Sequence, residues 1–405
     1  MDALTTPSNW QRVRLGDMTT SFTKQTGFDY SASIKPTLIK EQLPNYIPFI
    51  QNKDFLGHYI NYKTDYFIPN EIAIRFPQIL LNEKCLLISI SGAIGNVAVF
   101  NHSQDAFIGG AIAVLKFKEK KSLDFVMHFL MSASGQKLLL NGVKSSSHKN
   151  LTIADLRDLL IPLPPLNEQI AIANILSGLD HYLYTLDSLI LKKESVKKAL
   201  SFELLSQRKR LRGFNQAWQR VRLGDIGKPC MCKRVMKHQT TRYGEIPFYK
   251  IGTFGNTADA FISKKLFLEY KTKYSFPKKG DILISASGTI GRAVIYDGKP
   301  AYFQDSNIVW IDNDETLVKN DFLFYAYSNV KWNTEHTTIL RLYNDNFRNT
   351  LIPLPPLNEQ IAIANILSDL DNEIASLKNK KRQFENIKKA LNHDLMSAKI
   401  RVLKK

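Results

Sequence analysis

Few residue patterns in this chain suggest chemistry of its own. Cys230, Cys232 and His238 lie close together in the sequence, and thiolate and imidazole groups are ligands that zinc prefers. A tetrahedral zinc site needs four ligands, usually with a second Cys-x2–4-Cys pair, and the sequence has no such pair. The motifs HExxH, G-x-S-x-G and G-x-x-x-x-G-K-[ST] are absent as well. We therefore interpret the thiols as buried or incidental, and we predict neither catalytic residues nor a metal site on this chain.

Basic residues beside aromatic and small polar side chains suggest contact with DNA instead. Arginine and lysine bind phosphates and read guanine edges, while serine and asparagine add shorter contacts. Two stretches combine such residues, the polar loop at 142–151 and a loop-like segment at 228–243 that includes Tyr243. For each single residue, a solvated loop remains the alternative. The predicted DNA contacts are Lys144, Ser146, His148, Lys149, Lys228, Lys233, Arg234, Lys237, Arg242, Arg292 and Arg341.

A short glycine motif occurs twice, as Ser-Gly-Ala-Ile-Gly at 91–95 and Ser-Gly-Thr-Ile-Gly at 287–291. Glycine-rich turns can cradle a phosphate group. Two glycines three positions apart are also typical of a tight turn between strands, which needs no ligand. We favour the turn.

The charge of the chain indicates a polyanionic partner. The 405 residues include 55 Lys and Arg against 37 Asp and Glu, a formal net charge of +18. Such an excess most often serves nucleic acid binding, although many basic proteins carry it on solvated faces. Residues 1–159 carry a net +4, 160–213 carry +3, 214–350 carry +7 and 351–405 carry +4. Because the excess is spread over all four segments, a basic tail is not its source.

Composition bounds the class of protein. Hydrophobic residues make up 44% and charged residues 23%, which is typical of globular domains and excludes a disordered chain. Three cysteines are too few for a disulfide framework. No apolar run approaches the ~20 residues that span a bilayer, and the first residues lack the pattern of a signal peptide. We therefore expect a cytoplasmic protein.

An internal repeat organises the chain into two halves. Residues 160–180 read LIPLPPLNEQIAIANILSGLD, and 20 of these 21 positions recur at 351–371, 191 residues later. The eight residues Trp10 to Asp17 also recur unchanged from Trp218 to Asp225. Between these constant segments the two halves differ. A period near 200 residues indicates duplicated domains rather than a solenoid.

The variable and constant segments predict different structures. In the variable segments, short apolar runs such as 85–90 and 281–285 have strand length and are separated by glycine and asparagine, which predicts compact α+β domains. The constant segments predict long helices that begin after a Pro-Pro pair, with Asn167 as the N-cap and Glu168 in the first turn.

Both predicted helices carry apolar residues at alternating spacings of three and four, the pattern of a coiled coil. A helix of about 45 residues would be ~68 Å long, because an α-helix rises ~1.5 Å per residue. If the helices pair antiparallel, the molecule becomes a rod with a globular domain at each end and an approximate two-fold axis. The predicted seam, which is also the predicted subunit interface, comprises Leu176, Leu179, Leu183, Leu186, Ile190, Leu200, Leu204, Leu367, Leu370, Ile374, Leu377, Phe384, Leu391 and Leu395.

This arrangement resembles the specificity subunit of type I restriction–modification systems. The resemblance covers essentially the whole chain, and the Pro-Leu-Pro-Pro-x-x-Glu-Gln element, present twice, is its most specific part. It implies an α+β fold with two globular α/β target recognition domains, separated by two long helices that form an antiparallel coiled coil. It divides the chain into a first target recognition domain (1–159), a central helix (160–213), a second target recognition domain (214–350) and a C-terminal helix (351–405).

The resemblance also implies partners. Each target recognition domain would read one half of a split site in double-stranded DNA, and the helices would set the spacer and dock two modification subunits. S-adenosylmethionine, ATP and Mg would belong to the modification and restriction subunits, so that this chain is not an enzyme. The loop at 142–151 matches a polar loop of the family, whereas its counterpart near 337–346 departs from that pattern.

Two other functions remain open at this point. The chain could be a structural coiled-coil protein whose end domains bind protein, in which case its DNA affinity would show no steep salt dependence. It could also be a self-sufficient methyltransferase or nuclease, which would be active as the purified chain alone.

Overall fold

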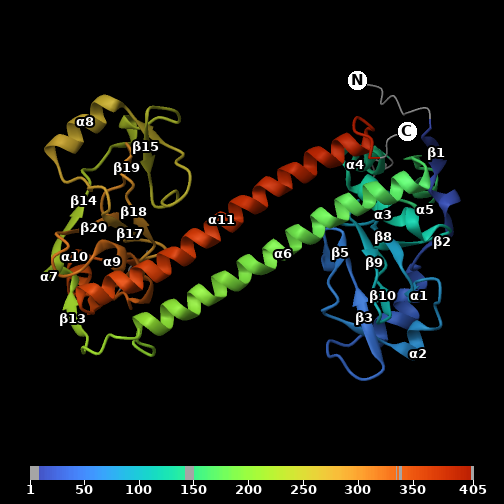
Figure 1. Ribbon diagram of the computed structural model, residues 1–405, viewed down its shortest axis with the longest axis horizontal. Helices are drawn as coiled ribbons and strands as arrows, with labels where there is room; N and C mark the ends of the chain where they lie inside the picture. The colour runs from blue at the N-terminus through green and yellow to red at the C-terminus, as the bar shows by residue number, and fades with distance from the viewer. Residues whose placement is uncertain (1–8, 142–149, 334, 337–339, 403–405) are drawn as a thin grey trace. The chain divides into compact units, whose positions relative to one another are not determined.

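The computed structural model describes residues 9–141, 150–333, 335–336 and 340–402 (Figure 1). The chain divides into two compact units. Unit 1 comprises Met1–Asp187 and Lys380–Lys405, and unit 2 comprises Ser188–Asn379.

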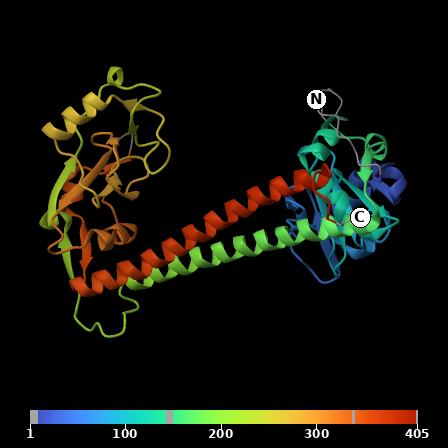
Figure 2. The same cartoon turned by 45° about the horizontal axis from the view of Figure 1, so that its top comes forward.

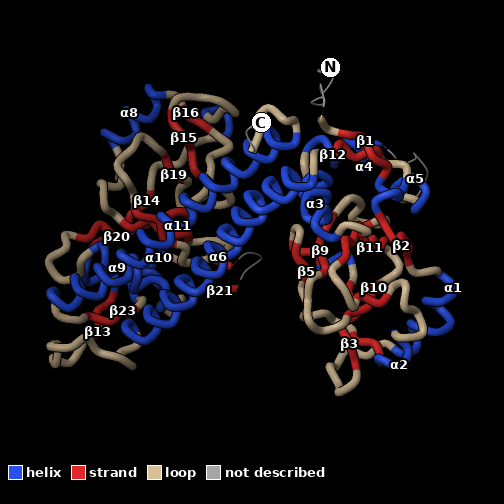
Figure 3. Tube along the Cα trace, turned by 45° about the vertical axis from the view of Figure 1, so that its right-hand side comes forward, coloured by secondary structure: helices blue, strands red, loops and turns tan. Residues whose placement is uncertain are grey.

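Two long helices contribute to both units. Helix α6 spans Leu166–Leu205 and helix α11 spans Leu357–Met396, each 40 residues long and drawn without a break in Figure 2. Each unit therefore contains one stretch of either helix together with a globular part, in which its strands gather (Figure 3).

Unit 1 contains two four-stranded sheets. The first, in the order β2-β11-β8-β9, is antiparallel throughout. The second, in the order β6-β3-β10-β7, has one parallel pair between β3 and β10. The pairs β1–β12 and β4–β5 form two-stranded ribbons. The strands are β1 (Gln11–Arg14), β2 (Thr19–Lys24), β3 (Tyr46–Ile50), β4 (Phe55–Leu56), β5 (Tyr59–Ile60), β6 (Phe67–Pro69), β7 (Leu80–Leu81), β8 (Cys85–Ser89), β9 (Val97–Phe100), β10 (Ala106–Ile108), β11 (Ile112–Phe117) and β12 (Leu160–Leu163); the short helices are α1 (Gly27–Asp29), α2 (Asn70–Ala73), α3 (Leu123–Met131), α4 (Ala133–Asn141) and α5 (Ile153–Arg157).

The first sheet of unit 1 is buried on both faces. Along β8, Leu86 and Ile88 belong to a core that includes α3 and the start of α6. Cys85 and Leu87 belong to a second core shared with the other sheet. Successive side chains of a strand point to opposite faces, so a strand covered on both sides is apolar at every position. This explains why 85–90 is apolar at every position except Ser89, whose buried hydroxyl donates to the Ala93 carbonyl.

Unit 2 repeats this plan with fewer strands. Its four-stranded antiparallel sheet has the order β14-β20-β17-β18, and its second sheet has the order β16-β15-β19 with β15 and β19 parallel. Here too, successive side chains of the central strand β17 face different cores. Ile282 and Ile284 face the core beside α6 and α11, and Leu283 faces the other core. The strands are β13 (Gln219–Arg222), β14 (Gly227–Met231), β15 (Ile246–Tyr249), β16 (Phe261–Ile262), β17 (Ile282–Ser285), β18 (Ala293–Ile295), β19 (Tyr302–Phe303), β20 (Ile308–Asn313), β21 (Glu335–His336), β22 (Leu340–Arg341) and β23 (Leu351–Leu354); the short helices are α7 (Leu223–Ile226), α8 (Lys264–Lys273), α9 (Asn320–Ala326) and α10 (Asn344–Asn349).

The long helices pair antiparallel within each unit. In unit 1, the Lys381 ammonium lies 2.6 Å from the Asp187 carboxylate, and the rings of Tyr182 and Phe384 lie 4.6 Å apart. In unit 2, Lys193 pairs with Glu373 at 2.8 Å. The prediction of two α+β domains attached to long antiparallel helices is therefore confirmed.

Four of the predicted seam residues belong to the cores of the globular parts, Leu176 and Leu395 in unit 1 and Leu204 and Leu367 in unit 2. All fourteen are buried or half-buried. Exposed apolar residues of the same helices lie on other faces, among them Tyr184, Leu191 and Phe202. No helix in the described part of the chain is long and apolar enough to cross a membrane.

The helices begin slightly later than the repeated segments. Residues 160–163 and 351–354 are strands β12 and β23, which pair with the strands that begin each half, and the helices follow the Pro-Pro pairs. Asn167 is therefore the second helical residue and not the N-cap that the sequence predicts. Its side-chain oxygen still accepts a hydrogen bond from the Glu168 N–H at 2.9 Å.

Candidate nucleic-acid interface

Each copy of the glycine motif forms a tight turn between two antiparallel strands. Residues 91–95 connect β8 to β9, and residues 287–291 connect β17 to β18. The glycines adopt positive φ angles of 73° at Gly92 and 66° at Gly288, which only glycine adopts at little cost. The strand geometry accounts for the glycines, as we favoured from the sequence.

Polar and basic residues of unit 2 gather around its glycine turn. Ser287 in the turn bridges to Arg341 on β22, and its hydroxyl donates to the Asn307 side-chain oxygen at 2.7 Å. The Asn307 N–H donates to the Asp305 carbonyl, and the Asp305 carboxylate pairs with the Arg234 guanidinium at 3.3 Å. We call these five residues the loop cluster of unit 2.

The loop cluster presents cations to solvent. The Arg234 side chain is 71% exposed although it is paired with Asp305. Arg341 and Arg292 are exposed as well, and Arg292 follows directly after the glycine turn, where its guanidinium donates to the Phe254 carbonyl at 3.0 Å. Exposed guanidinium groups held by such contacts are suited to phosphates and base edges.

Other predicted contacts lie away from the loop cluster. Lys228 pairs across the sheet with Asp312, at the end of β14 opposite to the loops. The Lys233 ammonium lies 5.1 Å from the centre of the Tyr274 ring. Lys237 and Arg242 are exposed on the segment beside β16. Lys144, Ser146, His148 and Lys149 lie outside the described residues.

Unit 1 has an equivalent turn with neutral neighbours. The Asn52 side chain donates to the Ser91 carbonyl at 2.6 Å, and Ser91 bridges to Asn150, the position 191 residues before Arg341. Gln25 directly after β2 is 3% exposed, and neither of its amide atoms has a hydrogen-bond partner among the described residues. The sequence prediction missed these amides. An extended alignment of the two halves would have paired Asn150 with Arg341.

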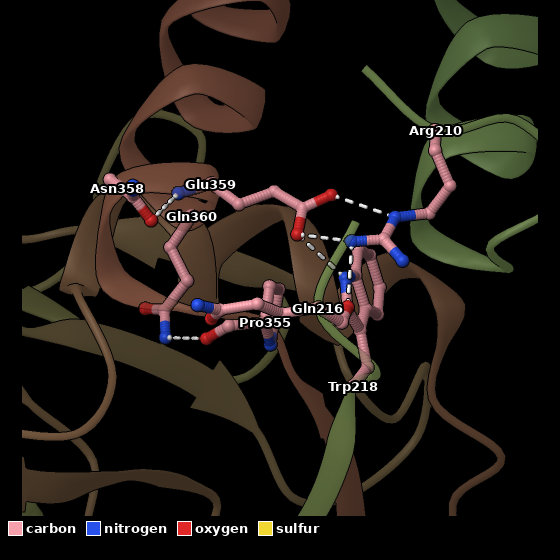
Figure 4. Close-up of polar contacts among 7 residues, drawn as sticks. All are labelled: Arg210, Gln216, Trp218, Pro355, Asn358, Glu359 and Gln360. Carbon is pink, nitrogen blue, oxygen red and sulfur yellow. Dashed lines mark hydrogen bonds and ion pairs between the residues drawn. The ribbon is translucent and has the colours of Figure 1, made fainter. Parts of the chain in front are cut away.

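The repeated Pro-Pro-Leu-Asn-Glu-Gln element anchors the start of each long helix. In unit 2, the Glu359 carboxylate is fully buried and accepts two hydrogen bonds from Arg210, at 3.0 and 2.9 Å, and one from the Trp218 indole at 2.9 Å (Figure 4). The Gln360 amide donates to the Pro355 carbonyl at 2.9 Å, and its oxygen accepts from the Lys319 N–H at 2.8 Å. These contacts fix the globular part of unit 2 to its helix pair.

The same anchor exists in unit 1. The Arg401 guanidinium pairs with the buried Glu168 carboxylate at 2.7 and 2.9 Å, and both residues lie 191 positions from their counterparts in unit 2. Arg401 also donates to the Asn9 side chain at 3.3 Å. Because the glutamate of the identical element pairs with an arginine in both units, and its glutamine amide donates to a proline carbonyl in both, we interpret the element as structural.

Buried titratable groups connect the globular part of unit 1 to its helices. The His58 ring nitrogen lies 3.3 Å from the Asp180 carboxylate, which also pairs with Lys388. His128 donates to or accepts from the Ser177 hydroxyl at 2.9 Å. Burial lowers the pKa of His58, and it lowers the pKa of His128 to about 3. Both imidazoles are therefore neutral at pH 7.

The cysteines are poor metal ligands in this structure. Burial raises the pKa of Cys232 to about 12 and also raises the pKa of Cys230, whereas zinc binds the thiolate. Across the described residues, no three His, Cys, Asp or Glu side chains are grouped so that they could hold a metal ion.

Comparisons with known proteins agree on one family. The family model of the type I restriction modification DNA specificity domain matches residues 7–193 and 215–386. A type I restriction enzyme specificity subunit of Haemophilus influenzae is 45% identical over 293 residues, which are 70% of this chain and 71% of that protein. The MjaVIII specificity subunit of Methanocaldococcus jannaschii is 26% identical over 99% of this chain and 95% of its own length. The crystal structure of an S subunit from M. genitalium superimposes with a TM-score of 0.61 over 97% of both chains, at 17% identity.

Proposed function

Since the chain belongs to the type I restriction–modification DNA specificity family, we propose that each of its two units reads one half of a split site in double-stranded DNA. The observation that carries this proposal is the loop cluster of unit 2. It places exposed arginines beside a glycine turn whose counterpart in unit 1 is surrounded by amides. The half-sites should differ, because the residues around the two turns differ.

The chemistry of the loops supports base recognition in addition to phosphate binding. Arginine pairs with guanine through two hydrogen bonds, and asparagine or glutamine pairs with adenine in the same way. Arg234 and Arg341 therefore favour guanine in the half-site of unit 2. Asn52 and Asn150 favour adenine in that of unit 1.

We further propose that the long helices dock two modification subunits. Apolar side chains exposed on α6 and α11 support this, because contiguous exposed apolar surface commonly marks a protein interface. Tyr184 is 61% exposed and Leu191 is 64% exposed, for example. S-adenosylmethionine, ATP and Mg would be bound by the partner subunits, and this chain would contribute recognition without catalysis.

A map of methylated adenines, the methylome, tests the proposal that the chain directs recognition of a bipartite site. The chain is co-expressed with its modification subunit, and methylated adenines are mapped across the genome. We expect one bipartite motif. Replacing residues 226–345 with the corresponding segment of a relative should change one half of the motif and leave the other half unchanged. Absence of a bipartite motif, or a motif unaffected by the replacement, would refute the proposal.

A further inference from the structure

Unit 2 has a polar pocket outside the loop cluster. The pocket has a volume of about 560 Å³ and lies between the end of α6, the ribbon β13–β23, helix α10 and the segment 329–333. Cations and amides line it, and no aspartate or glutamate of the described residues does. We call it the amide pocket. Its charged and amide side chains include Arg220, Lys331, Gln207, Asn329, Asn333 and Asn349.

The cations of the amide pocket are exposed and lack an acidic partner. Within the described residues, no carboxylate forms an ion pair with Arg220 or Lys331. Arg222 is exposed on the same strand as Arg220, and alternate residues of a strand point to the same face. Guanidinium, ammonium and amide groups all donate hydrogen bonds to phosphate oxygens. The pocket is therefore suited to a phosphate group and not to a cation.

Unit 1 has acids at the equivalent place. Arg14 takes the position of Arg222, because the first strands of the two halves have the same sequence. The Arg14 guanidinium lies 3.9 Å from the Asp158 carboxylate. The residue 191 positions after Asp158 is Asn349, and a second aspartate, on α5, is replaced by an asparagine of α10 in the same way. Asp345, the one acid of α10, does not line the pocket.

The amide pocket adjoins the glycine turn of unit 2. Trp332 lies between the pocket residues Lys331 and Asn333, and it packs so closely on the turn that a Cβ at Gly291 would lie 2.1 Å from its indole nitrogen. The chain continues into the ribbon β21–β22, where Arg341 belongs to the loop cluster, and then returns to the pocket through α10. A duplex whose bases reach Arg341 therefore brings its backbone close to the pocket.

We propose that the amide pocket binds one backbone phosphate of the DNA beside the half-site of unit 2. The inference rests on the proposed function. Arg220 and Lys331 neutralise the phosphate, and the asparagine amides donate to its oxygens. Such a contact positions the duplex without reading its sequence. Unit 1 lacks the contact, because its aspartates repel a phosphate at short range.

The experiment uses the purified complex of the full chain with its modification subunit, and a duplex that contains the bipartite motif. Arg220→Gln and Lys331→Gln each remove one charge from the pocket. Lys265→Gln is the matched control, because Lys265 is exposed on α8 of the same unit and does not line the pocket. Fluorescence anisotropy over a salt series measures the DNA affinity of each complex.

Loss of one phosphate contact makes the plot of log affinity against log salt concentration less steep by about 0.9. At about 0.15 M salt this change corresponds to about fivefold lower affinity. We expect both effects for the two pocket variants, and an affinity within about twofold of wild type for Lys265→Gln. The preference for the motif over a duplex with one altered base pair should stay the same, because a phosphate contact reads no sequence.

Duplexes with single methylphosphonate linkages locate the phosphate, because such a linkage is neutral. One linkage beside the half-site of unit 2 should lower the affinity of wild type about fivefold. The same linkage should have little effect on Arg220→Gln or Lys331→Gln, which have already lost the contact. Asn349→Asp introduces the residue that unit 1 has at this position, and it should weaken DNA binding as well.

The inference is wrong if the two pocket variants show the affinity and the salt dependence of Lys265→Gln. It is also wrong if every linkage that weakens wild type weakens these variants equally. Weaker binding of the modification subunit by the pocket variants, with DNA affinity unchanged, would assign the pocket to a protein contact and overturn the inference.

The two proposals fail in distinguishable ways. If the methylome shows a bipartite motif and the pocket variants bind DNA like the control, only the inference about the pocket is wrong. If no bipartite motif appears, the proposed function is wrong and the inference falls with it.

Discussion

The buried pair of Arg210 and Glu359 makes a quantitative prediction about the stability of unit 2. Substituting Arg210→Met leaves the Glu359 carboxylate fully buried, with the Trp218 indole as its remaining side-chain donor. Removing one member of a buried ion pair costs about 3–5 kcal/mol. The Arg210 side chain is 28% exposed, so we expect the lower end of that range, about 3 kcal/mol.

Urea unfolding followed by tryptophan fluorescence can measure this loss. Three of the four tryptophans belong to unit 2, so Trp10→Phe makes the emission specific for that unit. With a slope of about 2 kcal/mol per M, a loss of about 3 kcal/mol lowers the urea midpoint by about 1.5 M. Arg212→Met is the matched control, because Arg212 is exposed, and it should change stability by less than about 0.5 kcal/mol.

A double variant tests whether the unpaired buried carboxylate causes the loss in the free energy of unfolding. Arg210→Met combined with Glu359→Gln removes both charges, while the glutamine oxygen still accepts the indole N–H. Because the buried unpaired charge is gone, most of the stability should return, to within about 1 kcal/mol of wild type. The argument is wrong if Arg210→Met lowers the midpoint by less than about 0.3 M, or if the double variant is as unstable as the single one.

Three further predictions concern the turns, the histidines and the DNA contacts. A Cβ at Gly291 would lie 2.1 Å from the Trp332 indole nitrogen, whereas one at Gly288 meets nothing within 4 Å. Gly291→Ala should therefore lower the thermal midpoint much more than Gly288→Ala does. The Gly288→Ala variant loses only the ~1 kcal/mol that a side chain costs at a positive φ. His128 has its pKa lowered to about 3, so its contribution to stability is complete above pH 6.5 and is lost as pH falls from 6.5 toward 3. At pH 5 the loss in the free energy of unfolding is about 2 kcal/mol. Urea unfolding measured at several pH values should show this loss for wild type and not for His128→Gln. Arg341→Ala should weaken DNA binding by about 1–3 kcal/mol, measured by fluorescence anisotropy over a salt series, and unchanged affinity would remove Arg341 from the interface.

The sequence predicts the plan of the molecule well because that plan depends on periodic signals. The repeated segment predicts two units, the spacing of leucines predicts paired helices, and the glycine motif predicts a turn between strands. Each signal lies within a short window of the chain. The structure departs from it only in detail, as at Asn167, where the helix begins two residues earlier than expected, at Leu166.

The side-chain neighbourhoods were harder to predict, because they depend on the register between segments far apart in the chain. Arg210 belongs to the basic stretch 208–210, which reads as a solvated surface, yet it pairs with Glu359, 149 residues away. Lys228 seemed to belong with Arg234, but the pairing of β14 with β20 places it at the far end of the strand. Local spacing contains no information about either pairing.

Each of the two buried ion pairs joins residues from different halves of the sequence, and this has an evolutionary consequence. Glu168 and Arg210 lie in the same half of the sequence, yet each pairs with a residue of the other half, Arg401 and Glu359 respectively. A half-length chain would contain one acid and one arginine, and two copies of it could exchange them to form both pairs. The two ion pairs are therefore equivalent contacts, and neither depends on which variable segment precedes it. Recombination between related genes can then replace one variable segment at a time without disturbing either ion pair, and under the proposed function each replacement would give a new combination of half-sites.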